Sequence, residues 1–271
     1  MRRNNVGPNK FGKSLLAACS TLLFLLNGCV LRPEWQRLAD AGNLHAEWLE
    51  TARFRHLVLQ NGVAGSHLRI YVEGDGSPWI RAKRVAIDPT PHEPLMLRLM
   101  HDAGDAAAYL GRPCYFGTAT DRGCEQRWWT FDRYGQVVIN SMCEAANAIA
   151  RASGATSVEL VGYSGGGTVV LGMSTCTEGI DAVTTIAGNL DPEAWSAFHG
   201  YTPLHEVDLP QSQPESVTET HWQCSTDENV PPAITDAYFS VRPRVVRRVV
   251  GACTHATGWQ RYWPRIVRGA R

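Results

Sequence analysis

The chain has 271 residues, with 26 basic and 26 acidic side chains and 44% hydrophobic residues. This length and apolar content are enough for one large folded domain, and no repeat or low-complexity tract indicates a fibrous or disordered chain. The basic residues are scattered and form no nucleic-acid-binding motif, so we expect no nucleic-acid partner.

The first 28 residues predict an export signal. They contain four basic residues and no acidic one, and residues 15–26 form an apolar stretch that is too short for a membrane span. Residues 26–29 read Leu-Asn-Gly-Cys, which resembles the processing site of bacterial lipoproteins, with Cys29 as the acylated, palmitate-bearing N-terminus. Cys19 offers a weaker match to the same pattern, and a plain secretory signal with a free cysteine is the alternative.

The expected domain organisation follows from this leader. Cleavage would remove four of the 26 basic residues and leave 22 against 26 acidic ones, so the mature surface is mildly acidic. Val30 follows the cysteine in place of aspartate, and by resemblance to Gram-negative lipoproteins this favours the outer membrane, facing the periplasm. We expect a signal peptide over residues 1–28, a linker over 29–50 and one catalytic domain over 51–271.

Strands and helices alternate along the rest of the chain. Apolar residues at helical spacing predict helices within residues 94–101 and 131–151. Such alternation is typical of a mostly parallel sheet with crossover helices, an α/β fold. The expected strands cover residues 53–60, 68–72, 106–110, 157–161, 182–187, 217–223 and 244–250.

Residues 189–213 are interpreted as a short cap or loop insertion over the active site, with a connecting loop as the alternative. The segment carries the aromatic residues Trp195, Phe198 and Tyr201. Together with Trp79 and Trp222 it would line an apolar acyl pocket, although aromatic residues in such positions more often belong to the core.

A Gly-x-Ser-x-Gly element makes Ser164 a candidate nucleophile. Residues 162–166 read Gly-Tyr-Ser-Gly-Gly, after a β-branched run and before a helix-compatible segment. At such a strand-turn-helix junction the serine stands clear of the backbone, and the positions two before and two after it must be small. Gly162 and Gly166 meet that requirement.

A histidine base is expected beyond an acid that itself follows the serine. Of the histidines after Ser164, His199, His205 and His221 precede the most attractive acid, which leaves His255. This residue follows a β-branched run, where a loop at the carboxyl end of the last strand is expected.

Asp227 is the best candidate acid, because it stands where another strand-like stretch breaks into a turn before a proline-started helix. A buried carboxylate at this point would fix the histidine tautomer and stabilise the imidazolium. Glu228 is its close neighbour, and Asp191, after the run 182–188, is the main competitor.

These elements resemble the α/β-hydrolase superfamily: the elbow at 162–166, Asp-x-x-Val-Pro at 227–231 and His-x-x-Gly-Trp at 255–259. The resemblance covers about residues 50–268. It implies a mostly parallel central sheet flanked by helices, and hydrolysis of an acyl ester or a related bond. We expect neither a cofactor nor a metal ion.

The oxyanion hole departs from the pattern of many relatives. One donor is expected to be the main-chain N–H of Gly165, after the nucleophile. The second should come from the loop after strand 68–72, which reads Glu-Gly-Asp-Gly where many relatives have His-Gly or several glycines. The main-chain amides of Asp75 and Gly76 both remain candidates.

Six further cysteines in an exported chain favour disulfides, and none has the C-x-x-C spacing of a metal or redox site. The implied fold narrows the possible pairings. We expect Cys114–Cys124, Cys143–Cys176 and Cys224–Cys253, the last one closing two neighbouring strand ends.

The resulting hypothesis is an exported, lipid-anchored serine hydrolase that cleaves a carboxylic ester or thioester, small or lipid-like, through an acyl-enzyme. A peptidase or amidase with the same triad is one alternative. A catalytically silent lipoprotein that binds a partner at the envelope is the other. The sequence does not indicate an oligomeric state.

Overall fold

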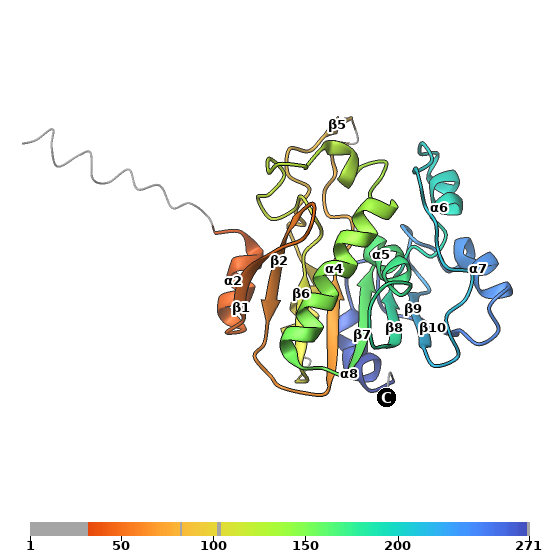
Figure 1. Ribbon diagram of the computed structural model, residues 1–271. Coiled ribbons are helices and arrows are strands. Elements are labelled where there is room, and N and C mark those ends of the chain that lie inside the picture. The colour runs from red at the N-terminus through yellow and green to blue at the C-terminus, as the bar shows by residue number, and fades with distance from the viewer. Residues whose placement is uncertain (1–31, 82, 102–103, 270–271) are drawn as a thin grey trace, which may run out of the picture. The chain divides into compact units, whose positions relative to one another are not determined.

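The computed structural model describes residues 32–81, 83–101 and 104–269. Glu34–Arg271 forms one folded unit, and an eight-stranded sheet runs through it in the order β1-β2-β6-β3-β7-β8-β9-β10 (Figure 1). Only β2 runs against the other strands, because it pairs antiparallel with both β1 and β6. The strands are β1 (His45–Glu50), β2 (Arg55–Gln60), β3 (His67–Val72), β6 (Ala107–Leu110), β7 (Ser157–Tyr163), β8 (Ile180–Ile186), β9 (Thr218–Cys224) and β10 (Val246–Val250).

Helices cover both faces of this sheet. In Figure 1, α4 and α5 lie in front of the strands and α8 lies behind them. The helices are α2 (Glu34–Ala41), α3 (Leu95–His101), α4 (Gln136–Ser153), α5 (Gly165–Met173), α6 (Pro192–His199), α7 (Asp236–Ser240) and α8 (Trp259–Gly269). The remaining elements are two 3-10 helices, η1 (Gln126–Trp129) and η2 (Pro232–Thr235), and a small ribbon of β4 (Trp79–Ile80) and β5 (Arg84–Val85).

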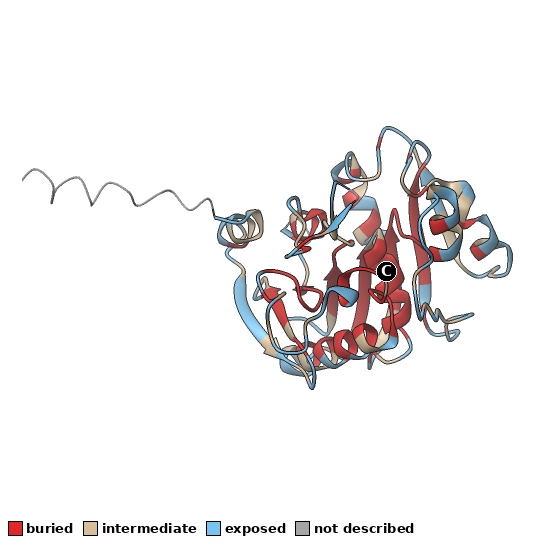
Figure 2. Cartoon of the chain, turned by 90° about the horizontal axis from the view of Figure 1, so that it is seen from above, coloured by how far each residue is buried: buried red, intermediate tan, exposed pale blue. Residues whose placement is uncertain are grey.

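Burial follows the position of a strand in the sheet. The central strands β3 and β7 are buried over nearly their whole length, as expected for parallel strands covered on both faces. The edge strand β1 is largely exposed and β10 is partly exposed, and both carry charged side chains, which discourages pairing with another chain. Figure 2 shows this contrast between the buried centre and the exposed rim.

The two central strands also share a buried ion pair. Arg69 on β3 lies opposite Glu159 on β7, and its Nε donates to Glu159 Oε2 at 2.6 Å. Thr184 on β8 donates to the other carboxylate oxygen. Because both charged side chains are paired and hydrogen-bonded, three adjacent strands are tied together in the centre of the sheet.

The expected α/β fold is confirmed, and all seven expected strands are present with ends within two residues of those predicted. The expected linker over 29–50 differs, because it contains α2 and β1. Strand β1 pairs along its whole length with β2, so the sheet begins before residue 51. Its mixed sequence, His-Ala-Glu-Trp-Leu-Glu, lacks the apolar run that marks a buried strand.

None of the described helices is both long and apolar enough to cross a membrane.

Candidate active site

The turn between β7 and α5 carries Ser164 in a sparsely populated backbone conformation, with φ 52° and ψ −122°. Such a conformation persists only where the surrounding structure enforces it. The enforcement is steric here: a Cβ on Gly162 would collide with the carbonyl of Gly166, and one on Gly166 would collide with the carbonyls of Val72 and Glu73 at the end of β3. The close approach of strand and helix therefore requires both glycines, as the sequence predicted.

His255 lies beside this serine. Its Nε2 is 2.9 Å from Ser164 Oγ, and its Nδ1 is 2.8 Å from Asp227 Oδ2. With the Nδ1 proton facing the carboxylate, Nε2 is free to accept the serine proton. The structure therefore brings together the three side chains that the sequence placed in a triad.

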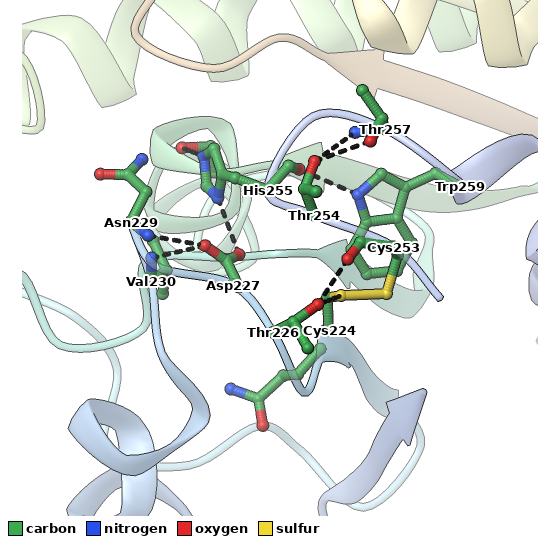
Figure 3. Close-up of polar contacts among 12 residues, drawn as sticks. Cys224, Thr226, Asp227, Asn229, Val230, Cys253, Thr254, His255, Thr257 and Trp259 are labelled. Carbon is green, nitrogen blue, oxygen red and sulfur yellow. Dashed lines mark hydrogen bonds and ion pairs between the residues drawn. A yellow bond between two sulfur atoms is a disulfide. The ribbon is translucent and has the colours of Figure 1, made fainter. Parts of the chain in front are cut away.

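The loops that carry the histidine and the acid are joined to each other (Figure 3). A disulfide between Cys224 and Cys253 links the ends of β9 and β10. Thr226 donates to the carbonyl of Cys253 at 2.6 Å. On the other side of His255, the indole N–H of Trp259 donates to the histidine carbonyl at 2.9 Å. These contacts fix the backbone on both sides of the imidazole.

Asp227 is buried, with a relative exposure of 3%. Its Oδ1 accepts hydrogen bonds from the main-chain N–H groups of Asn229 and Val230, both at 2.9 Å. Burial alone would raise the pKa of this carboxyl, but the hydrogen bonds and the interaction with His255 outweigh it and lower the pKa. Asp227 therefore remains ionised beside the imidazole.

The alternative acids have other surroundings. Asp191 caps the N-terminus of α6, where its side chain accepts the N–H of Ala194 at 2.9 Å. Among the contacts of the described residues, none joins Asp191 to His255. Glu228 is exposed. Geometry therefore favours Asp227 over both.

The loop after β3 lies directly against the start of α5. A Cβ on Gly165 would collide with the carboxylate of Asp75, and one on Gly74 would lie 3.2 Å from Ser164 Cβ. Gly76 faces elsewhere, since its own Cβ would meet the carbonyl of Pro89. Of the two candidates for the second donor, Asp75 thus lies closer to the start of the nucleophile helix.

The side chain of Asp75 has a role that the sequence did not indicate. Arg112 donates to its Oδ1 at 2.6 Å, Tyr134 donates to its Oδ2 at 2.7 Å, and Arg133 forms an ion pair with it at 3.1 Å. Burial alone would raise the pKa of the Asp75 carboxyl, but the two guanidinium charges outweigh it and lower the pKa. None of these partners falls in a recognisable motif, so sequence reasoning had no signal for them.

A cavity of about 780 Å³ opens beside Ser164 and His255. From the expected cap, Trp195 and Tyr201 line it, whereas Phe198 is exposed. Trp79 also lines the cavity, but Trp222 is buried in the core and does not. The walls thus combine aromatic rings with Ser164 and His255, and residues of the segment 189–213 line the same cavity.

The six cysteines form the three expected pairs, Cys114–Cys124, Cys143–Cys176 and Cys224–Cys253, each with sulfur atoms at bonding distance. Cys19 and Cys29 lie outside the described residues. Within the part of the chain that the structure describes, no group of three or more His, Cys, Asp or Glu side chains is arranged to hold a metal ion.

Neither a family model nor a curated protein sequence matches the chain. Several solved structures have a similar fold. An α/β serine hydrolase without a lid from Xanthomonas campestris is 14% identical, with a TM-score of 0.55 over 83% of this chain and 94% of its own. An esterase from Pyrococcus furiosus is 10% identical, with a TM-score of 0.55 over 84% of this chain and 93% of its own.

A puromycin-hydrolysing peptidase from Mycobacterium tuberculosis is 14% identical, with a TM-score of 0.56. The match covers 84% of this chain and 37% of that longer protein. At these identities the likeness concerns the fold alone. Together with the strand order and the mostly parallel sheet, it shows that the chain has the α/β-hydrolase fold.

Proposed function

We propose that the protein is a serine hydrolase that cleaves a carboxylic ester or thioester through an acyl-enzyme intermediate. The observation that carries this proposal is the continuous hydrogen-bonded chain Ser164–His255–Asp227 at the wall of a cavity. Histidine bonded to both a strained serine and a buried, ionised carboxylate is the arrangement that activates a hydroxyl nucleophile.

In the first half of the reaction, Ser164 Oγ attacks the acyl carbon while His255 Nε2 takes the hydroxyl proton. The carbonyl oxygen becomes an oxyanion, which the main-chain N–H groups of Gly165 and Asp75 stabilise in this proposal. When the tetrahedral intermediate collapses, the bond to the leaving group breaks and His255 returns its proton to the departing alcohol or thiol. Asp227 stabilises the imidazolium throughout.

In the second half, water attacks the acyl carbon of the ester on Ser164. His255 takes a proton from that water and then gives it to Ser164 Oγ as the carboxylic acid leaves. The same oxyanion donors serve both halves, so the loss of one donor is expected to slow each of them.

The test is hydrolysis of p-nitrophenyl esters of graded chain length, alongside p-nitroanilides as amide substrates. We expect the wild type to cleave esters and Ser164→Ala to lose this activity, while Ser240→Ala, an exposed serine on α7, keeps it. Faster cleavage of anilides than of esters would support the peptidase alternative. A wild type without activity on either class would support the silent lipoprotein.

We also propose that the chain is exported and lipid-anchored at Cys29, in the outer membrane facing the periplasm. The basic leader supports this proposal, and so do the three disulfides, which persist in oxidising compartments. Cys29→Ser is expected to move the protein from the membrane fraction to the soluble one, while Cys19→Ser leaves it in place. A Cys29→Ser variant that fractionates like the wild type, with no acyl mass on the mature wild type, would contradict the anchor.

A further inference from the structure

The carboxylate of Asp75 pairs with two arginines, Arg112 and Arg133, and only Arg133 lines the cavity beside Ser164. Arg112 is 1% exposed, and both of its Nη atoms donate to protein oxygens, one to Asp75 and the other to the carbonyl of Arg133 at 2.7 Å. The side chain of Arg133, in contrast, lines the cavity that contains Ser164. The side chain is only 5% exposed, and its Nε lies 3.1 Å from Asp75 Oδ2 in an ion pair that lacks the geometry of a hydrogen bond.

The charges of this cluster do not balance. Two guanidinium groups face one carboxylate, and among the described residues no other carboxylate lies within ion-pair distance of either arginine. The adjacent hydroxyls of Tyr115 and Tyr134 are neutral at physiological pH, because burial raises the pKa of both. A buried cluster with one uncompensated positive charge is costly unless an anion completes it.

The surroundings of Arg133 hold its guanidinium in place. Its Cζ lies 5.2 Å from the ring centroid of Tyr134 and 5.6 Å from that of Trp195, a residue that also lines the cavity. Aromatic faces stabilise a cation and restrict its motion without neutralising it. The side chain is therefore positioned in advance for a ligand in the cavity.

We propose that Arg133 binds a carboxylate on the substrate, so that the preferred substrates are esters or thioesters with a negatively charged acyl or alcohol group. A single surplus charge matches a monoanion, and the planar guanidinium fork matches the geometry of a carboxylate. The Ser164 end of the cavity would hold the reacting carbonyl, and Arg133 would hold the distal charge. This inference rests on the proposed hydrolase function.

The wild type provides the first test. The mono-4-nitrophenyl ester of glutaric acid and 4-nitrophenyl valerate have acyl chains of equal length, but only the former carries a carboxylate. After each rate is divided by the rate of hydrolysis by hydroxide, we expect kcat/KM to favour the anionic ester by about 10- to 100-fold, the effect of one charge-assisted hydrogen-bonded pair. Equal values, or a preference for valerate, would overturn the inference.

The second test compares two arginine variants. Arg133→Gln is expected to abolish the preference for the anionic ester, mainly through KM. Arg151→Gln removes the same charge from an exposed position on α4 and is expected to keep the preference. A full preference in Arg133→Gln would overturn the inference. If that variant does not fold, the wild-type comparison decides.

These outcomes are distinct from failure of the proposed function. A wild type that hydrolyses both esters equally and reacts with a fluorophosphonate keeps its hydrolase function but loses the proposed specificity. A wild type that hydrolyses neither ester and reacts with no fluorophosphonate overturns both proposals.

Discussion

The two halves of the candidate active site are held together in different ways. The half that carries Asp227 and His255 is built from two neighbouring strand ends, joined by a disulfide and by short-range hydrogen bonds. The half that carries Gly165 and Asp75 depends on buried charges from residues far along the chain, Arg112 and Arg133. A disulfide bond stabilises the first half, and buried ion pairs stabilise the second.

In the proposed mechanism, the two halves make different contributions to catalysis. The histidine and the acid need only a fixed mutual orientation, which local contacts provide. An oxyanion donor must stay aligned with a charge that develops during the reaction. The negative charge of Asp75 alone would destabilise the developing oxyanion. We infer that the two arginines both fix the loop in place and offset the negative charge of Asp75.

The largest expected effects concern the triad. Ser164→Ala and His255→Ala are each expected to lower kcat by roughly 10⁴- to 10⁶-fold, with little further loss in the double variant, because the two side chains act as a unit. Asp227→Asn is expected to cost about 10⁴-fold, through loss of the correct histidine tautomer. Steady-state kinetics on a p-nitrophenyl ester measures all four.

Asp191→Asn is the matched control for the acid. Because Asp191 caps α6, the change is expected to cost at most about 1 kcal/mol of stability and to leave most activity intact. A folded but inactive Asp191→Asn, with activity retained in Asp227→Asn, would transfer the role of the acid to Asp191.

The same contrast explains how far the sequence could predict the site. Ser164, Asp227 and His255 each stand within a few residues of a strand end, inside a short motif, so local pattern was enough to place them. The buried cluster around Asp75 unites three separate segments through tertiary contacts alone, and no local pattern marks such partners. Strand β1 escaped prediction for a related reason, since its side chains are mostly exposed and only its pairing with β2 defines it.

Loss of the Asp75 carboxylate is expected to have the next largest effect. Asp75→Asn leaves two buried guanidinium groups without a counter-charge, which is expected to lower the free energy of unfolding by about 3–5 kcal/mol. Urea denaturation of the variant measures this loss. Asp236→Asn removes a carboxylate from an exposed ion pair with Arg247 and is expected to cost less than about 1 kcal/mol. Similar losses in the two variants would show that the cluster does not stabilise the fold.

Loss of the Cys224–Cys253 disulfide is expected to lower stability by a smaller amount. Removing the Cys224–Cys253 bridge by a double change to Ala is expected to lower the free energy of unfolding by about 2–4 kcal/mol and also to reduce kcat. Removing Cys114–Cys124 in the same way should cost some stability with a smaller loss of kcat, since that bridge joins neither of the loops that carry Asp227 and His255. Equal losses of kcat after removal of either disulfide would show that the Cys224–Cys253 bond has no particular role in positioning the triad.

The last expected effect is a pH dependence of stability from Glu73. Burial raises the pKa of this carboxyl to about 7, despite hydrogen bonds from main-chain N–H groups that include that of Met96. The folded chain therefore keeps a proton that the unfolded chain loses above about pH 4.5, and stability should fall by up to about 3 kcal/mol between pH 4.5 and 7.

Denaturation at several pH values, compared between wild type and Glu73→Gln, tests this. The variant is expected to lack the decline, whereas Glu50→Gln, on the exposed edge strand, is expected to retain it. An unchanged decline in Glu73→Gln would assign the pH dependence to another group.

The most direct test of the hydrolase mechanism is the site of covalent labelling. The wild type is treated with a fluorophosphonate, and peptide mass mapping locates the adduct. The account predicts one adduct per chain, on Ser164, and none after Ser164→Ala or after heat denaturation of the wild type. Absence of an adduct on the native protein, or an adduct on a different serine, would contradict an activated nucleophile at the end of β7.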